Sequence, residues 1–163
     1  MAEVILICGK ICCGKSTYAQ TLIRERNAML LSVDELMLTV FGQDAGAAHD
    51  AYTARIQAYL LGKAAELAAH GVSAVLDWGF WTAQSRREAR DYFAALGIPV
   101  SLHVLTLSDG EWNARIEQRN AAVQSGQVQA YAVDEGLRKK CQALFEAPAP
   151  GEADVPVPAN QEG

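Results

Sequence analysis

The segment from residue 9 to residue 17, GKICCGKST, carries the clearest chemical signal in the sequence. It matches the pattern G-x-x-x-x-G-K-[ST], in which a glycine-rich loop presents backbone N–H groups to phosphate oxygens. Gly9 and Gly14 allow that loop geometry, and the helix expected to begin near Lys15 adds the partial positive charge of its N-terminus. We expect Lys15 to reach the β- and γ-phosphates of a nucleoside triphosphate and the Ser16 hydroxyl to ligate Mg²⁺.

The other members of the expected nucleotide-binding set are Cys12, Cys13 and Thr17. Both cysteines occupy variable positions of the loop, where the simplest interpretation is that small residues fit. The alternative is a redox-sensitive site, because a thiol near a helix N-terminus can be acidified. Oxidation there would block nucleotide binding.

Two carboxylates follow predicted strands. Asp77 ends the apolar run 72–77 and could hold Mg²⁺ through water or orient an acceptor hydroxyl; the alternative is a loop acid that caps a turn. Asp34 follows the run 29–33, where a carboxylate could orient an acceptor alcohol and take its proton. The alternative for Asp34 is structural, since Ser32, Asp34 or both could cap the next helix.

Arginines supply the positive charge that a transferred phosphoryl group needs. Arg115 and Arg119 are four residues apart and share one face of a predicted helix, from which both could bind phosphate bidentately. The alternative is a solvated face on which Glu111 pairs with Arg115. Arg86, in an earlier helix, is a candidate for contact with the acceptor.

Short apolar runs alternate with amphipathic segments along most of the chain. This pattern predicts an α/β fold, a doubly wound parallel sheet with helices on both faces, as in P-loop nucleotide kinases. In such a sheet the carboxyl ends of the strands share one edge, so the phosphate loop, Asp34 and Asp77 should converge there. The expected strands are 3–8, 29–33, 72–77 and 100–107, and the expected helices are 16–26, 36–41, 49–70, 82–96, 109–123 and 133–145.

The composition is that of an ordinary globular protein of one domain. The chain has 163 residues, a net charge of −5 and no apolar stretch near the ~20 residues of a membrane span. We expect a kinase domain over 1–147 and a Pro-rich acidic tail over 148–163, mostly irregular, in which 154–157 could add an edge strand. The acidic balance disfavours a long nucleic acid as partner, and a cytoplasmic location is expected.

Several segments together resemble a family of small P-loop kinases related to the polynucleotide-kinase phosphotransferase domain, zeta toxin and chloramphenicol phosphotransferase. These segments are GKICCGKST, LLSVDELM, AVLDWGFWTAQSRREAR, ARIEQRN and VDEGLRKKCQALFEAP. The resemblance implies a kinase with an arginine-bearing lid. It implies that Asp34 handles the acceptor hydroxyl, that Arg115 and Arg119 contact nucleotide phosphates, and that Arg86 lies on the acceptor side.

The leading hypothesis is therefore a kinase that transfers the γ-phosphate of Mg·ATP to a hydroxyl of a small-molecule or nucleotide-like acceptor. Trp78, Phe80 and Trp81 could form an apolar wall for that acceptor. One alternative is a nucleotide-dependent regulatory ATPase without an acceptor. Another is a 5′-hydroxyl kinase of short nucleic acid ends, which would need little basic surface.

Overall fold

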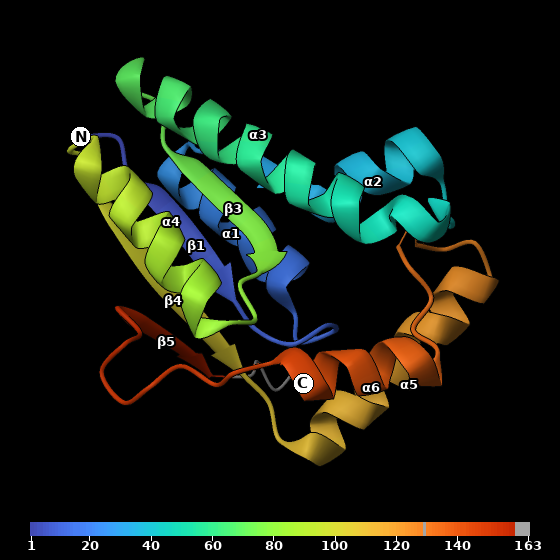
Figure 1. Cartoon of the computed structure of the whole chain (residues 1–163). Helices are drawn as coiled ribbons and strands as arrows, with labels where there is room; N and C mark the ends of the chain where they lie inside the picture. Colours follow the sequence, from blue (N-terminus) through green and yellow to red (C-terminus); the bar gives the residue numbers. More distant parts are fainter. Residues whose placement is uncertain (129, 159–163) are drawn as a thin grey trace.

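One parallel sheet organises the molecule in the computed structural model, which describes residues 1–128 and 130–158 (Figure 1). Its strand order in that part of the chain is β2-β3-β1-β4-β5. Neighbouring strands in this order are parallel, so crossover connections and not tight hairpins join them. The strands are β1 Val4–Cys8, β2 Met29–Ser32, β3 Ala74–Gly79, β4 Val100–Thr106 and β5 Val155–Pro158.

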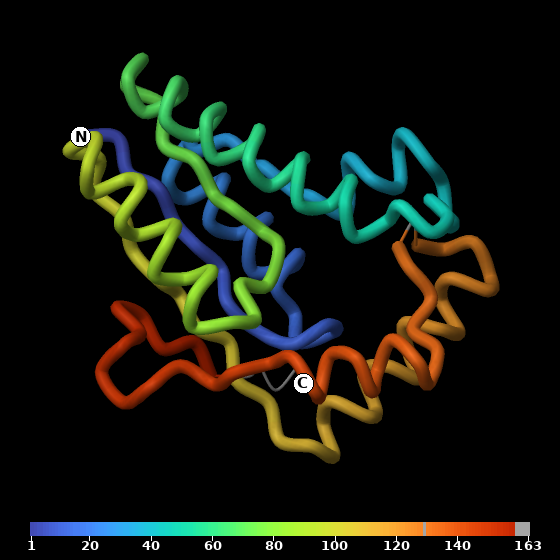
Figure 2. Tube along the Cα trace, viewed as in Figure 1, coloured from blue at the N-terminus to red at the C-terminus, as the bar shows by residue number. Residues whose placement is uncertain are grey.

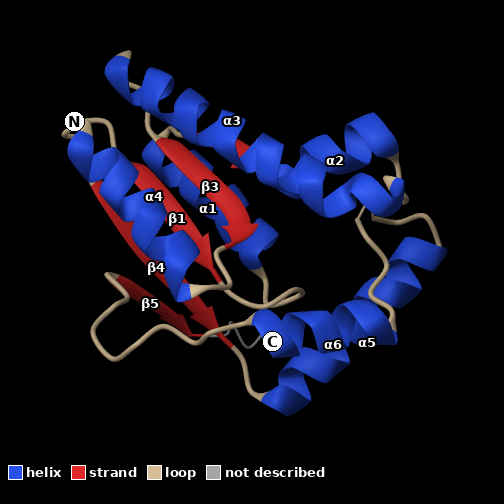
Figure 3. Cartoon of the chain, in the orientation of Figure 1, coloured by secondary structure: helices blue, strands red, loops and turns tan. Residues whose placement is uncertain are grey.

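Helices cover both faces of the sheet (Figure 3), which confirms the predicted doubly wound fold. On one face, Ala64, Ala89 and Phe93 from α3 and α4 pack against Val4 and Leu6 of β1. On the other face α1 packs against Ile5 and Ile7 of β1, as the alternating side chains of a strand require. The helices are α1 Lys15–Arg26, α2 Val33–Phe41, α3 His49–Ala69, α4 Ala83–Ala95, α5 Asp109–Gln124 and α6 Glu135–Leu144, with a 3-10 turn at Gly46–Ala48.

The helices α5 and α6 lie apart from the two covering layers, beyond the carboxyl ends of the strands. The tube in Figure 2 shows them running from the end of β4 toward the turn between α2 and α3. They pack on the loop that follows β1 through a cluster formed by Cys12, Trp112, Ile116, Val133 and Cys141. We call α5, α6 and the described residues between them the lid.

The helix after β2 begins earlier than the sequence predicts. α2 starts at Val33 rather than at residue 36, because the Ser32 side chain accepts a hydrogen bond from the Glu35 backbone N–H and caps the helix. Asp34 therefore lies in the first turn of α2 and is not the capping residue. The remaining predicted elements match the structure within a few residues, the usual uncertainty at element ends.

The C-terminal segment contains the edge strand that the sequence allowed for residues 154–157 within an otherwise irregular tail. Val155–Pro158 forms β5, which pairs in parallel with β4 at the edge of the sheet, in the register His103 with Val155. Edge strands tolerate proline because one side of each needs no ladder hydrogen bond. The described part of the predicted tail is thus a component of the domain, and residues 159–163 lie outside the described residues.

No helix in residues 1–128 and 130–158 is both long enough and apolar enough to cross a membrane.

Candidate active site at the carboxyl edge of the sheet

The loop between β1 and α1 has the backbone geometry of an anion nest. Cys12 and Gly14 have positive φ angles of 59° and 94°, and the Gly9 backbone N–H is bonded to the Gly79 carbonyl at 3.0 Å. The ammonium group of Lys15 folds over this loop and donates to the Lys10 carbonyl at 2.7 Å. The loop thus curves around its own lysine at the start of α1, an arrangement suited to phosphate oxygens.

Ser16 and Asp77 form the part of the site that suits a divalent cation. The Ser16 hydroxyl donates to Oδ2 of Asp77 at 3.3 Å, although 61 residues separate them. Asp77 is 6% exposed, and this burial raises the pKa of its carboxyl, with Lys15 and Arg119 acting in the opposite direction and Asp34 in the same direction. One hydroxyl and one carboxylate fit Mg²⁺, which binds few protein ligands and keeps several waters or phosphate oxygens.

Asp34 is an exposed carboxylate that faces the same region. Its carboxylate makes no hydrogen bond or ion pair with any other residue in the described part of the chain, and Ser32 performs the capping of α2. Its negative charge nevertheless contributes to raising the pKa values of Asp77 and Tyr131. Asp34 lies two residues beyond Ser32, which pairs in register with Asp77 at the carboxyl edge of the sheet.

The helix α5 carries Arg115 to the phosphate loop. A Cβ atom added to Gly14 would lie 2.9 Å from Nη1 of Arg115, so the guanidinium group touches the loop at its second glycine. Glu111, the alternative partner of Arg115, instead completes a capping box with Ser108 at the start of α5. Arg119, one turn later, is half-buried and lowers the pKa of Cys12, against the larger raising effect of burial. Both arginines thus act on the loop.

Arg86 does not face the acceptor side, contrary to the prediction. Its side chain is 1% exposed and lies in the interior between α4 and the C-terminal segment. The guanidinium group donates to the carbonyls of Phe80 and Glu146 at 3.0 and 2.9 Å and pairs with the carboxylate of Glu152. The helical spacing of the arginines in α4 could not show which one points inward, because the partner lies 66 residues later.

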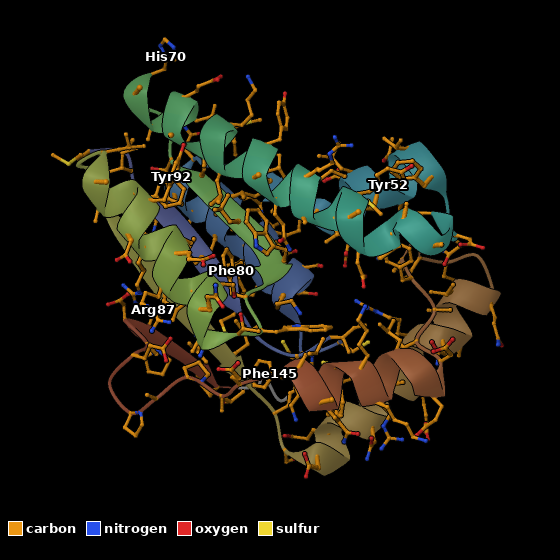
Figure 4. The ribbon with its side chains drawn as sticks, viewed as in Figure 1. Tyr52, His70, Phe80, Arg87, Tyr92 and Phe145 are labelled. Atoms are coloured by element: carbon orange, nitrogen blue, oxygen red, sulfur yellow. The ribbon has the colours of Figure 1, made fainter. Side chains whose placement is uncertain are left out.

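The three aromatic residues after Asp77 divide among three environments. Phe80, labelled in Figure 4, is a core residue, which excludes it from an acceptor wall, and its ring stacks on that of Trp78 at 4.9 Å between centroids. Trp78 also packs against the α2–α3 cluster that contains Val33 and Met37. Trp81 packs against the lid cluster. Of these three aromatic residues, Trp78 is therefore the one that packs against α2 and α3, on the expected acceptor side.

Cys12 of the loop lacks the electrostatic signature of a reactive thiol. Cys12 is buried, and this burial raises the pKa of its thiol despite the nearby charges of Arg119 and Lys15. Burial likewise raises the pKa of Cys8 to about 11. A raised pKa lowers the thiolate fraction at neutral pH, so these features favour the interpretation that small side chains fit the loop.

The sequence did not predict the contacts between the lid and the α2–α3 pair. Gln43 donates to the Ala130 carbonyl at 2.7 Å, and Lys140 pairs with Asp50 at 3.0 Å. Trp112 of α5 holds the base of the lid, since its indole N–H donates to the Ile11 carbonyl at 2.6 Å. The partners in all three pairs are more than 80 residues apart, and no local pattern in the sequence marks them.

The family of the chain is shown over most of its length. A family model described as AAA domain matches residues 4–147, which is most of the chain. The chain belongs to this AAA domain family. Among proteins of curated function, none matches the sequence.

Solved structures similar to this AAA domain chain include P-loop kinases. An APS kinase from Mycobacterium tuberculosis, in complex with AMPPNP and APS, has a TM-score of 0.69 at 18% identity, over 98% of this chain and 90% of that one. A gluconokinase from Sinorhizobium meliloti has a TM-score of 0.64 at 14% identity, over 98% and 83%. Kti12 from Chaetomium thermophilum, in complex with ADP-AlF3, has a TM-score of 0.72 at 13% identity, over 98% and 90%. At these identities the likeness shows the fold, which is that of P-loop kinases.

Proposed function

We propose that the protein is an ATP-dependent phosphotransferase that phosphorylates a hydroxyl group of a small molecule. The observation that supports this most is the position of Asp34. Its carboxylate is exposed, takes no part in capping α2 and lies two residues beyond Ser32, which pairs in register with Asp77 at the carboxyl edge of the sheet. A nucleotide-binding site needs the loop alone, whereas an unengaged carboxylate next to it suits an alcohol that must lose a proton.

Each remaining group has a role that its position supports. The loop over residues 9–17, including Thr17, and the ammonium group of Lys15 bind the triphosphate. Ser16 and Asp77 hold Mg²⁺, which neutralises charge on the phosphate oxygens when it is bound. Arg115 and Arg119 balance the charge on the transferring phosphoryl group, and Asp34 orients the acceptor and accepts its proton.

The test is ADP release from Mg·ATP with and without a panel of acceptors: sugars, sugar acids, nucleosides, aminoglycosides and short 5′-hydroxyl oligonucleotides. Lys15→Ala is the blank, and Lys63→Ala is the matched control because Lys63 is a partly exposed residue of α3 whose ion pair is with Glu66 of the same helix. We expect one acceptor class to stimulate release in the wild type and in Lys63→Ala but not in Lys15→Ala. ATP binding without stimulation by any acceptor would overturn the phosphotransferase proposal in favour of a nucleotide-dependent regulator.

A further inference from the structure

Tyr131 lies in the lid segment between α5 and α6, at its contact with the α2–α3 pair. Its ring meets the His49 ring edge-on at 5.8 Å between centroids, and it packs against the apolar cluster that contains Val33, Met37 and Leu60. Trp78, from the end of β3, packs against the same cluster. Tyr131, from the lid, and Trp78, from β3, therefore pack against one apolar cluster of α2 and α3.

Hydrogen bonds hold the backbone on both sides of Tyr131. Two residues later, the backbone N–H and carbonyl of Val133 make paired hydrogen bonds of 2.7 Å with the Asn120 side chain of α5. On the other side of Tyr131, the Ala130 carbonyl accepts from Gln43. The tyrosine is thus held between a fixed point on α5 and a bridge to the α2–α3 turn.

The Tyr131 hydroxyl is buried but makes no hydrogen bond with any residue in the described part of the chain. Buried hydroxyl groups in folded proteins almost always have a partner, so one without a partner needs an explanation. A second such hydroxyl, that of Thr53, lies on α3 one helical turn after His49. Two unpaired hydroxyl groups thus come from elements on the expected acceptor side.

The ionisation of Tyr131 fits a hydrogen-bond donor. Burial, together with the charge of Asp34, raises the pKa of its phenol, which therefore keeps its proton at neutral pH. Asp34 directly follows Val33, a member of the apolar cluster against which Tyr131 packs. The group proposed to deprotonate the acceptor and a phenol without a partner thus border the same region.

We propose that Tyr131 is an acceptor-binding residue, whose hydroxyl donates a hydrogen bond to a polar group beside the acceptor hydroxyl that Asp34 orients. This inference rests on the proposed phosphotransferase function and narrows its substrate class. The acceptor carries two neighbouring polar groups on a small carbon skeleton, as a polyol does, because two separate polar residues bind it next to the apolar cluster and Trp78. A site that hydrogen-bonds a substrate hydroxyl rejects analogues that lack it.

Access to this site requires the lid tip to separate from α2 and α3. The contacts that hold it are the packing of Tyr131 against the apolar cluster, one hydrogen bond from Gln43, the exposed ion pair of Lys140 with Asp50, and the edge of His49. The polar contacts are few, and the exposed ion pair contributes little to stability. Closure over a bound acceptor would supply the Tyr131 hydroxyl with its partner and exclude water from the phosphoryl group.

The test is Tyr131→Phe, with Tyr59→Phe as the matched control because Tyr59 is an exposed residue elsewhere on α3. ADP release from Mg·ATP is measured with D-ribose, D-gluconate, glycerol and adenosine, and with monohydroxy alcohols in parallel. We expect a polyol to stimulate the wild type. Tyr131→Phe should raise the KM for that polyol about 3- to 10-fold, the loss of one neutral hydrogen bond, at unchanged KM for ATP. Its melting temperature should not fall, because the hydroxyl has no partner within the fold.

Each contrary result has a distinct meaning. An unchanged polyol KM in Tyr131→Phe, a parallel rise in the KM for ATP, or a lower melting temperature would overturn the role of Tyr131 and leave phosphoryl transfer standing. Stimulation by monohydroxy alcohols but not by polyols would overturn the substrate class alone. Stimulation by no acceptor would contradict the proposed function itself, and this inference with it.

Discussion

The Ser16 hydroxyl donates a 3.3 Å hydrogen bond to Oδ2 of Asp77 and so joins the first turn of α1 to β3. Burial raises the pKa of Asp77, so its folded-state pKa lies above the unfolded value. The contribution of the Asp77 carboxyl to stability is therefore fully present below the unfolded pKa and is lost as the pH rises through the folded pKa. At neutral pH the buried charge therefore opposes folding when no cation is bound.

For Asp77→Asn we accordingly expect two opposite effects. The melting temperature of the nucleotide-free protein at pH 7 should rise, because the buried negative charge is gone. The Mg²⁺ concentration for half-maximal ADP release should increase by about 10- to 100-fold, the usual cost of losing a group that holds a metal through water. Thermal denaturation and Mg²⁺ titrations measure the two effects, and a lower melting temperature with unchanged Mg²⁺ dependence would contradict both.

Asp34→Asn should separate phosphoryl transfer from nucleotide binding. Loss of a positioned general base lowers kcat by roughly 10²- to 10⁴-fold, whereas the affinity for Mg·ATP should remain because Asp34 lies outside the phosphate loop. Glu35→Gln is the control, since Glu35 is the adjacent exposed acid of α2. Equal turnover in Asp34→Asn and the wild type, measured by ADP release with an active acceptor, would refute the base assignment.

Arg115→Lys should lose most of its transfer activity although the positive charge is kept. The guanidinium group touches Gly14 and can bind phosphate oxygens bidentately, which an ammonium group cannot. We expect kcat to fall by roughly 10²-fold or more, in the range of a lost preorganised donor to the transition state. Arg55→Lys, on the exposed face of α3, should retain wild-type rates. Full activity of Arg115→Lys would indicate that only charge matters at this position.

Arg86→Ala should act on stability. Removal of a buried guanidinium leaves the Glu152 carboxylate and the carbonyls of Phe80 and Glu146 without their donor. We expect the free energy of unfolding to fall by about 3 kcal/mol, as for other broken buried pairs. Arg87→Ala, at an exposed position of α4 (Figure 4), should stay within about 0.5 kcal/mol of the wild type. Urea denaturation compares the two, and equal midpoints would rule out the anchoring role.

Cys12 should react slowly with iodoacetamide in the native protein. Burial raises the pKa of its thiol, so the thiolate fraction at pH 7 to 8 is smaller in the folded chain than in the unfolded chain. Alkylation followed by mass spectrometry of peptides should therefore show Cys12 modified faster in urea than in buffer. Faster modification in the native state would restore the redox-sensitive alternative for this loop.

The sequence alone determined the features whose causes are local. The phosphate loop is nine consecutive residues with obligatory glycines, so its geometry and its lysine follow from the pattern itself. The convergence of Asp34 and Asp77 on that loop also followed, because parallel strands bring their carboxyl ends to one edge of a sheet. The family comparison places the chain in the AAA domain family, and solved structures of kinases share its fold.

Only the tertiary structure decided which side chains face the site from distant parts of the chain. The sequence favoured Arg86 for the acceptor side, but the C-terminal segment, folded back as β5, buries Arg86 with Glu152. Tyr131 lies in a segment without periodicity, so nothing local assigns it a direction. Its position follows from Asn120 on one side and the α2–α3 turn on the other. Such contacts depend on how separate elements pack, and packing is a property of the whole chain.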